Sequence, residues 1–309
     1  MTTRKIIFVT GATGAQGGSV AKALLASGEY AVRALTRNAQ SEKAIALKEQ
    51  GADVVEGDFE NEAELTELIK GCYGVFGVTN FWEHFGNEFR QGKNLVNAVH
   101  AAGIKHFVLS TLPNYHALSN GKLSVAHCDI KAALEEYTKS LGLPATFLHV
   151  AYYYENFLSF FPLQKDDADG YWFGFPQGDT KLSMYSVEDT GPLVLQLFNH
   201  PEQYIGRLAG AVGEDRSCAA YAAVMTKVLG YPVHYRYIPY ETYAAMGWQG
   251  AEEIAAMFEV QRLHIPERWL HLIESYGLHP AMQSFEQWLT KHKSSFPAHT
   301  KVPSAALEL

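Results

Sequence analysis

The sequence lacks most of the features that mark secreted, metal-dependent and hydrolytic proteins. Its three cysteines, Cys72, Cys128 and Cys218, form no CxxC pair. This argues against a disulfide framework and suits a reducing compartment. The chain contains no HExxH, GxSxG or P-loop pattern, so nothing in it supports a zinc peptidase or an elbow-type serine hydrolase. The scattered histidines have no recognisable ligand spacing, and we expect no metal site.

Basic clusters and long apolar runs are also missing. The net charge is -8, and without a basic patch we expect no direct binding of nucleic acid. The most apolar stretch, residues 143–161, is interrupted by His149, Glu155 and Asn156, so we expect no membrane span. The first residues run straight into a predicted strand and leave no room for a signal peptide. We therefore expect a cytoplasmic protein whose 309 residues hold one large domain or two unequal ones.

A glycine-rich turn near the amino terminus is the most informative feature. An apolar run, residues 6–9, is followed by Gly11, Gly14 and Gly17 and then by apolar residues at helical spacing. In such a unit the glycines let the backbone approach a pyrophosphate, and the helix N-terminus holds its negative charge. The spacing is GxxGxxG rather than GxGxxG, and a purely structural turn is the alternative. Its position at the first strand favours a dinucleotide site.

Strand and helix patterns alternate up to residue 150. We expect strands at 30–36, 53–55, 75–79, 106–109 and 146–150, and helices at 63–70, 87–102 and 124–140. This alternation with short connections predicts an α/β fold, a Rossmann-type doubly wound parallel sheet. Residues 1–150 would form this NAD(P)-binding domain.

The alternation ends after residue 150. Residues 166–178 predict an excursion or hairpin, and residues 186–189 have capping-box order before a helix at 190–198. A strand at 233–238 and helices at 268–275 and 284–291 follow. We expect residues 151–296 to form a smaller α+β C-terminal lobe that completes a ligand cleft, with some chain returning to the first domain. Residues 297–309 contain two prolines and predict a loosely held tail.

The end of the second predicted strand indicates which dinucleotide is preferred. An acidic residue at this place accepts hydrogen bonds from the ribose of NAD, whereas a basic residue pairs with the 2′-phosphate of NADP. The sequence reads Thr36-Arg37-Asn38, with no acid before Glu42. It therefore favours NADP(H) over NAD(H), with a solvated arginine as the alternative. Asp58, Thr79 and Asn80 follow other strands and are expected to line the adenosine half of the site.

The usual catalyst of short-chain reductases is absent. Those enzymes use a tyrosine with a lysine four residues later, and none of the 17 tyrosines here has lysine at that position. His127 and Lys131 keep the spacing and share one helical face. Histidine can donate a proton near neutral pH, so both are candidate catalytic residues. Simple packing of His127 and solvation of Lys131 are the alternatives.

The segments TGATGAQGG, LTRN, GDF, VTNFW, HCDIK and YYYENF occur in this order. Together they resemble the NmrA-like family, an atypical branch of the short-chain dehydrogenase/reductase superfamily, and closely resemble its NADPH-sensing members. The resemblance runs from Lys5 to about Trp288. It implies a Rossmann lobe of NAD(P)-binding type with a small C-terminal lobe.

The resemblance also implies a set of cofactor contacts along the cleft. The pyrophosphate would lie against Gly11, Thr13, Gly14, Ala15 and Gln16, and the 2′-phosphate against Arg37. Asp58 and Phe59 would flank the adenine, and Thr79, Asn80 and Phe81 the adjoining ribose. Lys131 would hold the nicotinamide ribose, and Tyr153, Glu155 and Asn156 would lie at the nicotinamide end.

Two functions remain open at this point. The first hypothesis is a redox-state sensor that binds NADP(H) and changes its contacts with a regulatory protein partner, because the cofactor motifs occur without the tyrosine catalyst. The alternative is an NADPH-dependent oxidoreductase of a small carbonyl or quinone-like substrate, with His127, Tyr153 or water as proton donor. Aromatic residues at 152–161 could wall a nicotinamide or quinone ring, or simply pack in the core. A homodimer is also open.

Overall fold

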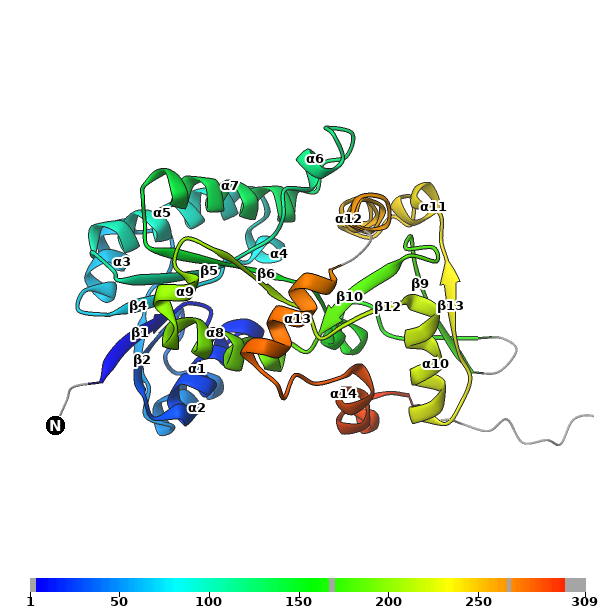
Figure 1. Cartoon of the computed structure of the whole chain (residues 1–309), viewed down its shortest axis with the longest axis horizontal. Helices are drawn as coiled ribbons and strands as arrows, with labels where there is room; N and C mark the ends of the chain where they lie inside the picture. The colour runs from blue at the N-terminus through cyan, green and yellow to red at the C-terminus, as the bar shows by residue number, and fades with distance from the viewer. Residues whose placement is uncertain (1–3, 167–169, 266–267, 298–309) are drawn as a thin grey trace, which may run out of the picture.

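Both faces of the first strand are buried, so the sheet that contains it must be covered on two sides. Ile7, Phe8 and Val9 are each 0% exposed, and successive residues of a strand point to opposite faces. The computed structural model describes residues 4–166, 170–265 and 268–297. It places helices on both faces of a parallel sheet (Figure 1). The predicted Rossmann-type fold is confirmed.

Seven strands form the main sheet in the order β11-β6-β5-β4-β1-β2-β3, and all neighbours are parallel. The order reverses between β1 and β4, and in open α/β sheets ligands bind at such a switch point. The strands are β1 (Lys5–Val9), β2 (Tyr30–Thr36), β3 (Asp53–Glu56), β4 (Gly74–Gly77), β5 (His106–Thr111), β6 (Ala145–Val150) and β11 (Leu208–Ala211).

Two hydrophobic cores lie on the two faces of this sheet. Phe8 and Phe107 pack with Leu95 on one face, whereas Ile7 and Val9 pack on the other, where the core includes residues of α1 and α8. The first face is covered by α3 (Glu62–Ile69), α5 (Glu88–Ala101) and α7 (Ala126–Ser140). The second is covered by α1 (Ala15–Ser27), α2 (Glu42–Glu49), α8 (Thr190–Asn199) and α13 (Trp269–Leu278) (Figure 1).

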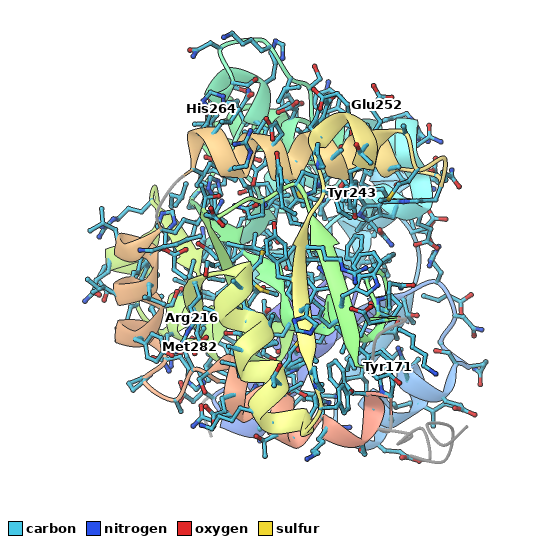
Figure 2. All side chains as sticks on the ribbon, turned by 90° about the vertical axis from the view of Figure 1, so that its right-hand side faces the viewer. Tyr171, Arg216, Tyr243, Glu252, His264 and Met282 are labelled. Atoms are coloured by element: carbon cyan, nitrogen blue, oxygen red, sulfur yellow. The ribbon has the colours of Figure 1, made fainter. Side chains whose placement is uncertain are left out.

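The C-terminal part, defined here as the elements outside this layered domain after residue 150, contains two three-stranded sheets. One holds β7 (Tyr152–Tyr153), β10 (Lys181–Tyr185) and β12 (Glu214–Ser217). The other holds β8 (Gln164–Lys165), β9 (Tyr171–Phe175) and β13 (Val233–Tyr237). The helices here are α10 (Cys218–Leu229), α11 (Tyr240–Ala244), α12 (Ala251–His264) and α14 (Phe285–Lys291). Figure 2 looks onto this end, with α12 crossing the view between Glu252 and His264.

Short helices complete the chain, and some of the C-terminal chain returns to the main sheet. The short helices are α4 (Phe81–His84), α6 (Tyr115–Leu118) and α9 (Pro201–Tyr204). Strand β11 extends the main sheet beside β6, and α8 packs on α1. Ser186 and Asp189 lie in the connection from β10 to α8, and Glu155 lies in a 3₁₀ turn after β7.

Two local expectations can be compared with the structure. The predicted excursion at residues 166–178 is a hairpin, because β8 pairs antiparallel with β9, although residues 167–169 lie outside the described part. The capping-box prediction at residues 186–189 was wrong. Ser186 accepts from the backbone of Glu188 and caps a 3₁₀ turn, while Asp189 accepts a hydrogen bond from the backbone of Gln283. The Asp189 carboxylate, which a capping box would direct to the backbone of Ser186, is instead hydrogen-bonded to a residue that is distant in the sequence.

Some expectations concern absences or chain ends. Within residues 4–166, 170–265 and 268–297, no helix is long and apolar enough to cross a membrane. In the same ranges, no group of three His, Cys, Asp or Glu side chains could hold a metal ion. Residue Pro297 accepts a hydrogen bond from Tyr231, and the rest of the predicted tail, residues 298–309, lies outside the described residues.

The turn between β1 and α1 is fixed by close contact of backbone with backbone. A Cβ atom on Gly17 would lie 2.3 Å from the carbonyl oxygens of both Thr10 and Gly11. Gly11 itself adopts a positive φ of 57°, a conformation that side chains with a Cβ rarely take. The helix therefore begins as close to the end of β1 as the backbone allows.

We predict that Gly17→Ala destabilises the fold, because its new methyl group meets two backbone oxygens that cannot move independently of β1. We expect a loss of about 2–3 kcal/mol in the free energy of unfolding, measured by urea denaturation. Gly277→Ala is the matched control in helix α13, where an added Cβ meets nothing within 4 Å. An equal loss in both variants would contradict this account of the turn.

Candidate functional site

A cavity of about 1240 Å³ lies over the carboxyl ends of the central strands and continues into the C-terminal part. Its walls include the glycine turn after β1 and the segment Val78–Glu83 after β4. The cavity is also lined by Ser110 within β5, by Leu112 just after β5, and by Val150 at the end of β6. The cavity therefore occupies the switch point at which the fold is expected to bind its ligand.

The glycine turn presents the backbone donors at the start of α1 to the cavity. In an α-helix the first N–H groups have no carbonyl within the helix to bind, and here these include the N–H groups of Ala15 and Gln16. Gly14, the N-cap residue, has no side chain to cap them, and the first turn contains no acidic residue. These N–H groups and the positive end of the helix dipole suit a phosphate group.

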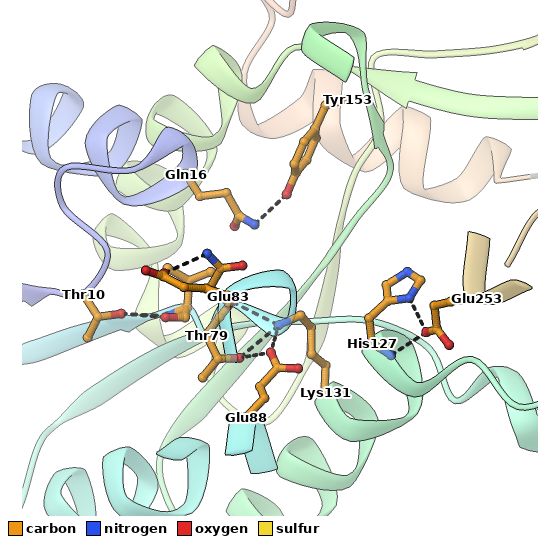
Figure 3. A network of polar contacts seen from close by, with 11 residues as sticks. Thr10, Gln16, Thr79, Glu83, Glu88, His127, Lys131, Tyr153 and Glu253 are labelled. Carbon is orange, nitrogen blue, oxygen red and sulfur yellow. Dashed lines mark hydrogen bonds and ion pairs between the residues drawn. The ribbon is translucent and has the colours of Figure 1, made fainter. Parts of the chain in front are cut away.

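Gln16 supplies a second polar group at the same end of the cavity. Its Nε2 donates a hydrogen bond of 2.6 Å to the hydroxyl of Tyr153 (Figure 3). Its Oε1 is buried without a hydrogen-bond partner among the described residues. An unsatisfied buried acceptor is unfavourable, so a ligand with a donor group, such as a carboxamide or a hydroxyl, fits this place.

Lys131 is held in a buried ionic cluster rather than solvated. Its Nζ donates to the carbonyl oxygen of Thr79 at 3.1 Å and to Thr79 Oγ1 at 2.9 Å, and it forms an ion pair with Glu88. The Thr79 hydroxyl also donates to Glu88 at 2.5 Å. Glu88 is 0% exposed. Figure 3 shows the three side chains as one connected group.

His127 forms a dyad with Glu253, a residue of α12 in the C-terminal part. Its Nδ1 lies 2.6 Å from Glu253 Oε1, which also accepts the backbone N–H of His127 at 2.8 Å. Burial raises the pKa of Glu253, but the hydrogen bonds and charge from His127 outweigh it, and the pKa is lowered. Figure 3 shows the second ring nitrogen of His127 turned away from Glu253.

His127 of this dyad packs against aromatic rings and lines the cavity. The ring centroids of Phe81 and Trp82 lie 5.9 Å and 5.4 Å from that of His127. Cys128, the next residue, also lines the cavity, but burial raises its pKa well above the usual value, so its thiol stays protonated. Burial likewise raises the pKa of Tyr153 despite its bond from Gln16. Both shifts disfavour loss of a proton from the Cys128 thiol and the Tyr153 hydroxyl near neutral pH.

Beyond the dyad the cavity becomes an apolar chamber. Its walls combine residues from β7, β9 and α11 with residues from the loop before α12 and from α12 itself. Phe160 at 67% exposure and Met246 at 45% lie on its open side. We call this the aromatic chamber, and its ring-bearing members are Tyr152, Phe160, Phe161, Trp172, Phe173, Phe175, Tyr243 and Trp248.

Not every residue predicted for the site lines the cavity. Gly11, Gly14, Ala15, Gln16, Thr79, Asn80, Phe81, His127, Lys131, Tyr153 and Asn156 do so, and Thr13, Arg37, Asp58, Phe59 and Glu155 do not. The cofactor contacts of both groups of residues stay predictions.

The predicted residues outside the cavity wall have other contacts. Arg37 is paired with Glu83, and Asp58 accepts from the backbone of Glu60. Glu155 is directed away from the cavity, because its carboxylate accepts from Ser186 Oγ at 2.7 Å and from the backbone of Val187 at 3.0 Å. Burial raises its pKa. Glu155 thus stabilises the connection to α8.

Sequence reasoning missed the acidic partners of the cationic residues. Glu253 lies 126 positions from His127, and no local spacing links them. Glu88 is the first residue of helix α5, where acidic residues are common, so its position gives no sign of a partner such as Lys131. Glu83 alone carried a signal, since it stands in the same post-strand segment as Thr79 and Asn80.

Comparison with known proteins gives the family. A model of the NmrA-like family matches residues 3–289. The chain belongs to the NmrA-like family. One relative, the NmrA-like family domain-containing oxidoreductase FrzB from Cladobotryum sp, is 32% identical over 282 residues, which cover 82% of each protein.

Solved structures share the fold of this NmrA-like protein. NmrA, a negative transcriptional regulator, superposes with a TM-score of 0.83 at 23% identity, over 94% of this chain and 95% of that one. It has also been solved in complex with NAD and with NADP. The NADPH-dependent quinone oxidoreductase QOR2 from Escherichia coli, complexed with NADPH, has a TM-score of 0.77 at 22% identity, covering 93% and 99%.

We predict that Lys131→Met destabilises the NmrA-like protein by about 3 kcal/mol, because it leaves the buried Glu88 carboxylate without its cation. The double variant Lys131→Met/Glu88→Gln should recover part of this loss, since no buried charge then remains. Chemical denaturation measures both. Lys227→Met, which breaks an exposed pair with Glu286, is the control and should change stability by less than about 1 kcal/mol. A double variant no more stable than Lys131→Met would contradict the pairing.

Proposed function

We propose that this NmrA-like protein binds NADP(H) in preference to NAD(H) and reduces an apolar carbonyl or quinone-like compound that carries a ring. The observation that carries this proposal is the continuity of the cavity from the glycine turn, past the His127–Glu253 dyad, to the aromatic chamber. Its volume of about 1240 Å³ exceeds the roughly 300–1,000 Å³ of pockets for single ligands. It has room for a dinucleotide and a second molecule.

The residues along the cavity fit a dinucleotide by their chemistry. The N–H groups at the start of α1 would hold the pyrophosphate, and the cradle has no space for a Cβ at Gly17. Gln16, with its unpartnered Oε1, and Lys131 would hold the nicotinamide half. A reduced nicotinamide, when bound, supplies a hydride. This chain's own residues would orient the substrate, exclude water and supply the proton.

His127 is the proposed proton donor. Glu253 accepts from Nδ1 and stabilises the imidazolium, in which Nε2 carries a proton that can pass to a substrate oxygen. The rings of Phe81 and Trp82 limit access of water to the imidazole. The aromatic chamber would hold the apolar body of the substrate by burial and ring contacts.

We predict that His127→Gln lowers kcat for NADPH-dependent reduction of a quinone or aldehyde at least about 100-fold. NADPH affinity, measured by calorimetry, should change little, because the hydride donor and its phosphate contacts are untouched. His100→Gln, on the exposed side of α5, should keep the parental rate. A turnover in His127→Gln equal to that of the parent would remove this histidine from the reaction.

Arg37 is the proposed contact of the 2′-phosphate, as expected from its place at the end of β2. Its side chain is 61% exposed and so is accessible to a ligand. A charge-assisted contact contributes about 1.5–3 kcal/mol. Asp58 and Phe59 would flank the adenine of the same cofactor.

A cytoplasmic location of the protein remains a prediction.

We predict that Arg37→Gln weakens NADPH binding about tenfold or more while changing NADH affinity little, because NADH lacks the 2′-phosphate. Isothermal titration of both nucleotides measures this difference. Arg207→Gln, which removes the same charge from an exposed residue at the amino end of β11, should leave both affinities as in the parent. An unchanged preference in Arg37→Gln would refute the assignment.

A redox sensor is the second candidate, favoured by the absence of a Tyr-Lys catalyst and by the fold shared with NmrA, a negative transcriptional regulator. In that case cofactor binding would alter protease sensitivity or contacts with a protein partner, and turnover would be negligible. NADPH consumption across a panel of quinones and aldehydes, run beside direct binding, separates the two functions. The aromatic chamber supports the reductase, since a sensor has no need of a second apolar site.

A further inference from the structure

We propose that Glu83 competes with the 2′-phosphate of NADP(H) for Arg37 and so limits the preference of this protein for NADP(H) over NAD(H). This inference rests on the proposed cofactor binding. It assigns a role in specificity to a residue that lies outside the glycine turn and the end of β2. Glu83 belongs to α4, the short helix that follows β4, and it lines the cavity.

The carboxylate of Glu83 engages two side chains proposed for the adenosine half of the cofactor. Its Oε1 lies 2.5 Å from Arg37 Nη1, and its Oε2 accepts a hydrogen bond of 3.2 Å from Asn80 Nδ2. A carboxylate and a phosphate are recognised by arginine in the same way, through charged N–H donors. In this structure Glu83 is therefore the anion that Arg37 binds.

The pair is weak enough to be exchanged. The Arg37 and Glu83 side chains are 61% and 39% exposed, and exposed ion pairs contribute about 0.2–1 kcal/mol. By contrast, the Lys131–Glu88 pair is buried, with side chains 13% and 0% exposed. Arg37 can therefore leave Glu83 for a ligand at little cost, whereas Lys131 is fixed in place.

The two nucleotides differ in what they meet at this carboxylate. A 2′-phosphate carries a charge of about -2 near neutral pH, so it would take Arg37 from Glu83 and also lie close to a negative group. The 2′-hydroxyl of NAD(H) carries no charge and can donate a hydrogen bond to a carboxylate. Glu83 therefore weakens the binding of NADP(H) and does not weaken the binding of NAD(H).

The test is isothermal titration of NADPH and NADH into the parent and Glu83→Gln, which keeps the shape of the side chain and removes its charge. We expect Glu83→Gln to bind NADPH about two- to fivefold more tightly than the parent and to bind NADH no more tightly than the parent. Glu286→Gln removes one negative charge from an exposed pair outside the cavity and should change neither. NADPH binding that is no tighter, or an equal gain for NADH, would overturn the proposal.

A double-mutant cycle tests whether the effect passes through Arg37. In an Arg37→Gln background, Glu83→Gln should give a smaller gain in NADPH affinity than in the parent. An undiminished gain would mean that Glu83 does not compete for Arg37. Failure of the parent to bind either nucleotide would refute the proposed cofactor binding itself. Binding of both with an unchanged ratio in Glu83→Gln refutes only the role of Glu83.

Discussion

The structure depends on the close contact between the first turn of α1 and the end of β1. A Cβ at Gly17 would lie within 2.3 Å of two carbonyl oxygens, so only glycine allows the helix to begin there. This approach aims the free N–H groups of the helix over the edge of the sheet, at the point where the strand order reverses. The cavity lies against this turn.

A second feature is that each candidate cationic group around the site already has an acidic partner. Arg37 is paired with Glu83, Lys131 with Glu88 and His127 with Glu253. Unpaired charges in a partly buried cleft are unfavourable, so this pairing stabilises the protein by itself. At Arg37, the proposed binding of a 2′-phosphate would exchange one anionic partner for another, because the existing Arg37–Glu83 pair is exposed.

Much of the layered domain could be predicted from local sequence patterns. The strands from Tyr30 to Val150 lie close to their expected ranges, because parallel strands buried on both faces are short continuous apolar runs. The position of Arg37 could be predicted because it directly follows a strand, and the shared face of His127 and Lys131 could be predicted from their spacing of four residues in a helix. The capping-box prediction at Ser186 was wrong, because the backbone of Gln283, distant in sequence, hydrogen-bonds Asp189.

The sequence by itself therefore determined the glycine turn, the order of the elements and the face shared by His127 and Lys131, since each depends on residues within one or two turns of each other. Only the tertiary structure decided which acids meet these cations, and that α11 and the loop before α12 bring Tyr243 and Trp248 over the cavity. It also placed β11 beside β6. The physical reason is that ion pairs, ring contacts and strand pairing act over a few ångströms in space, whatever the separation along the chain.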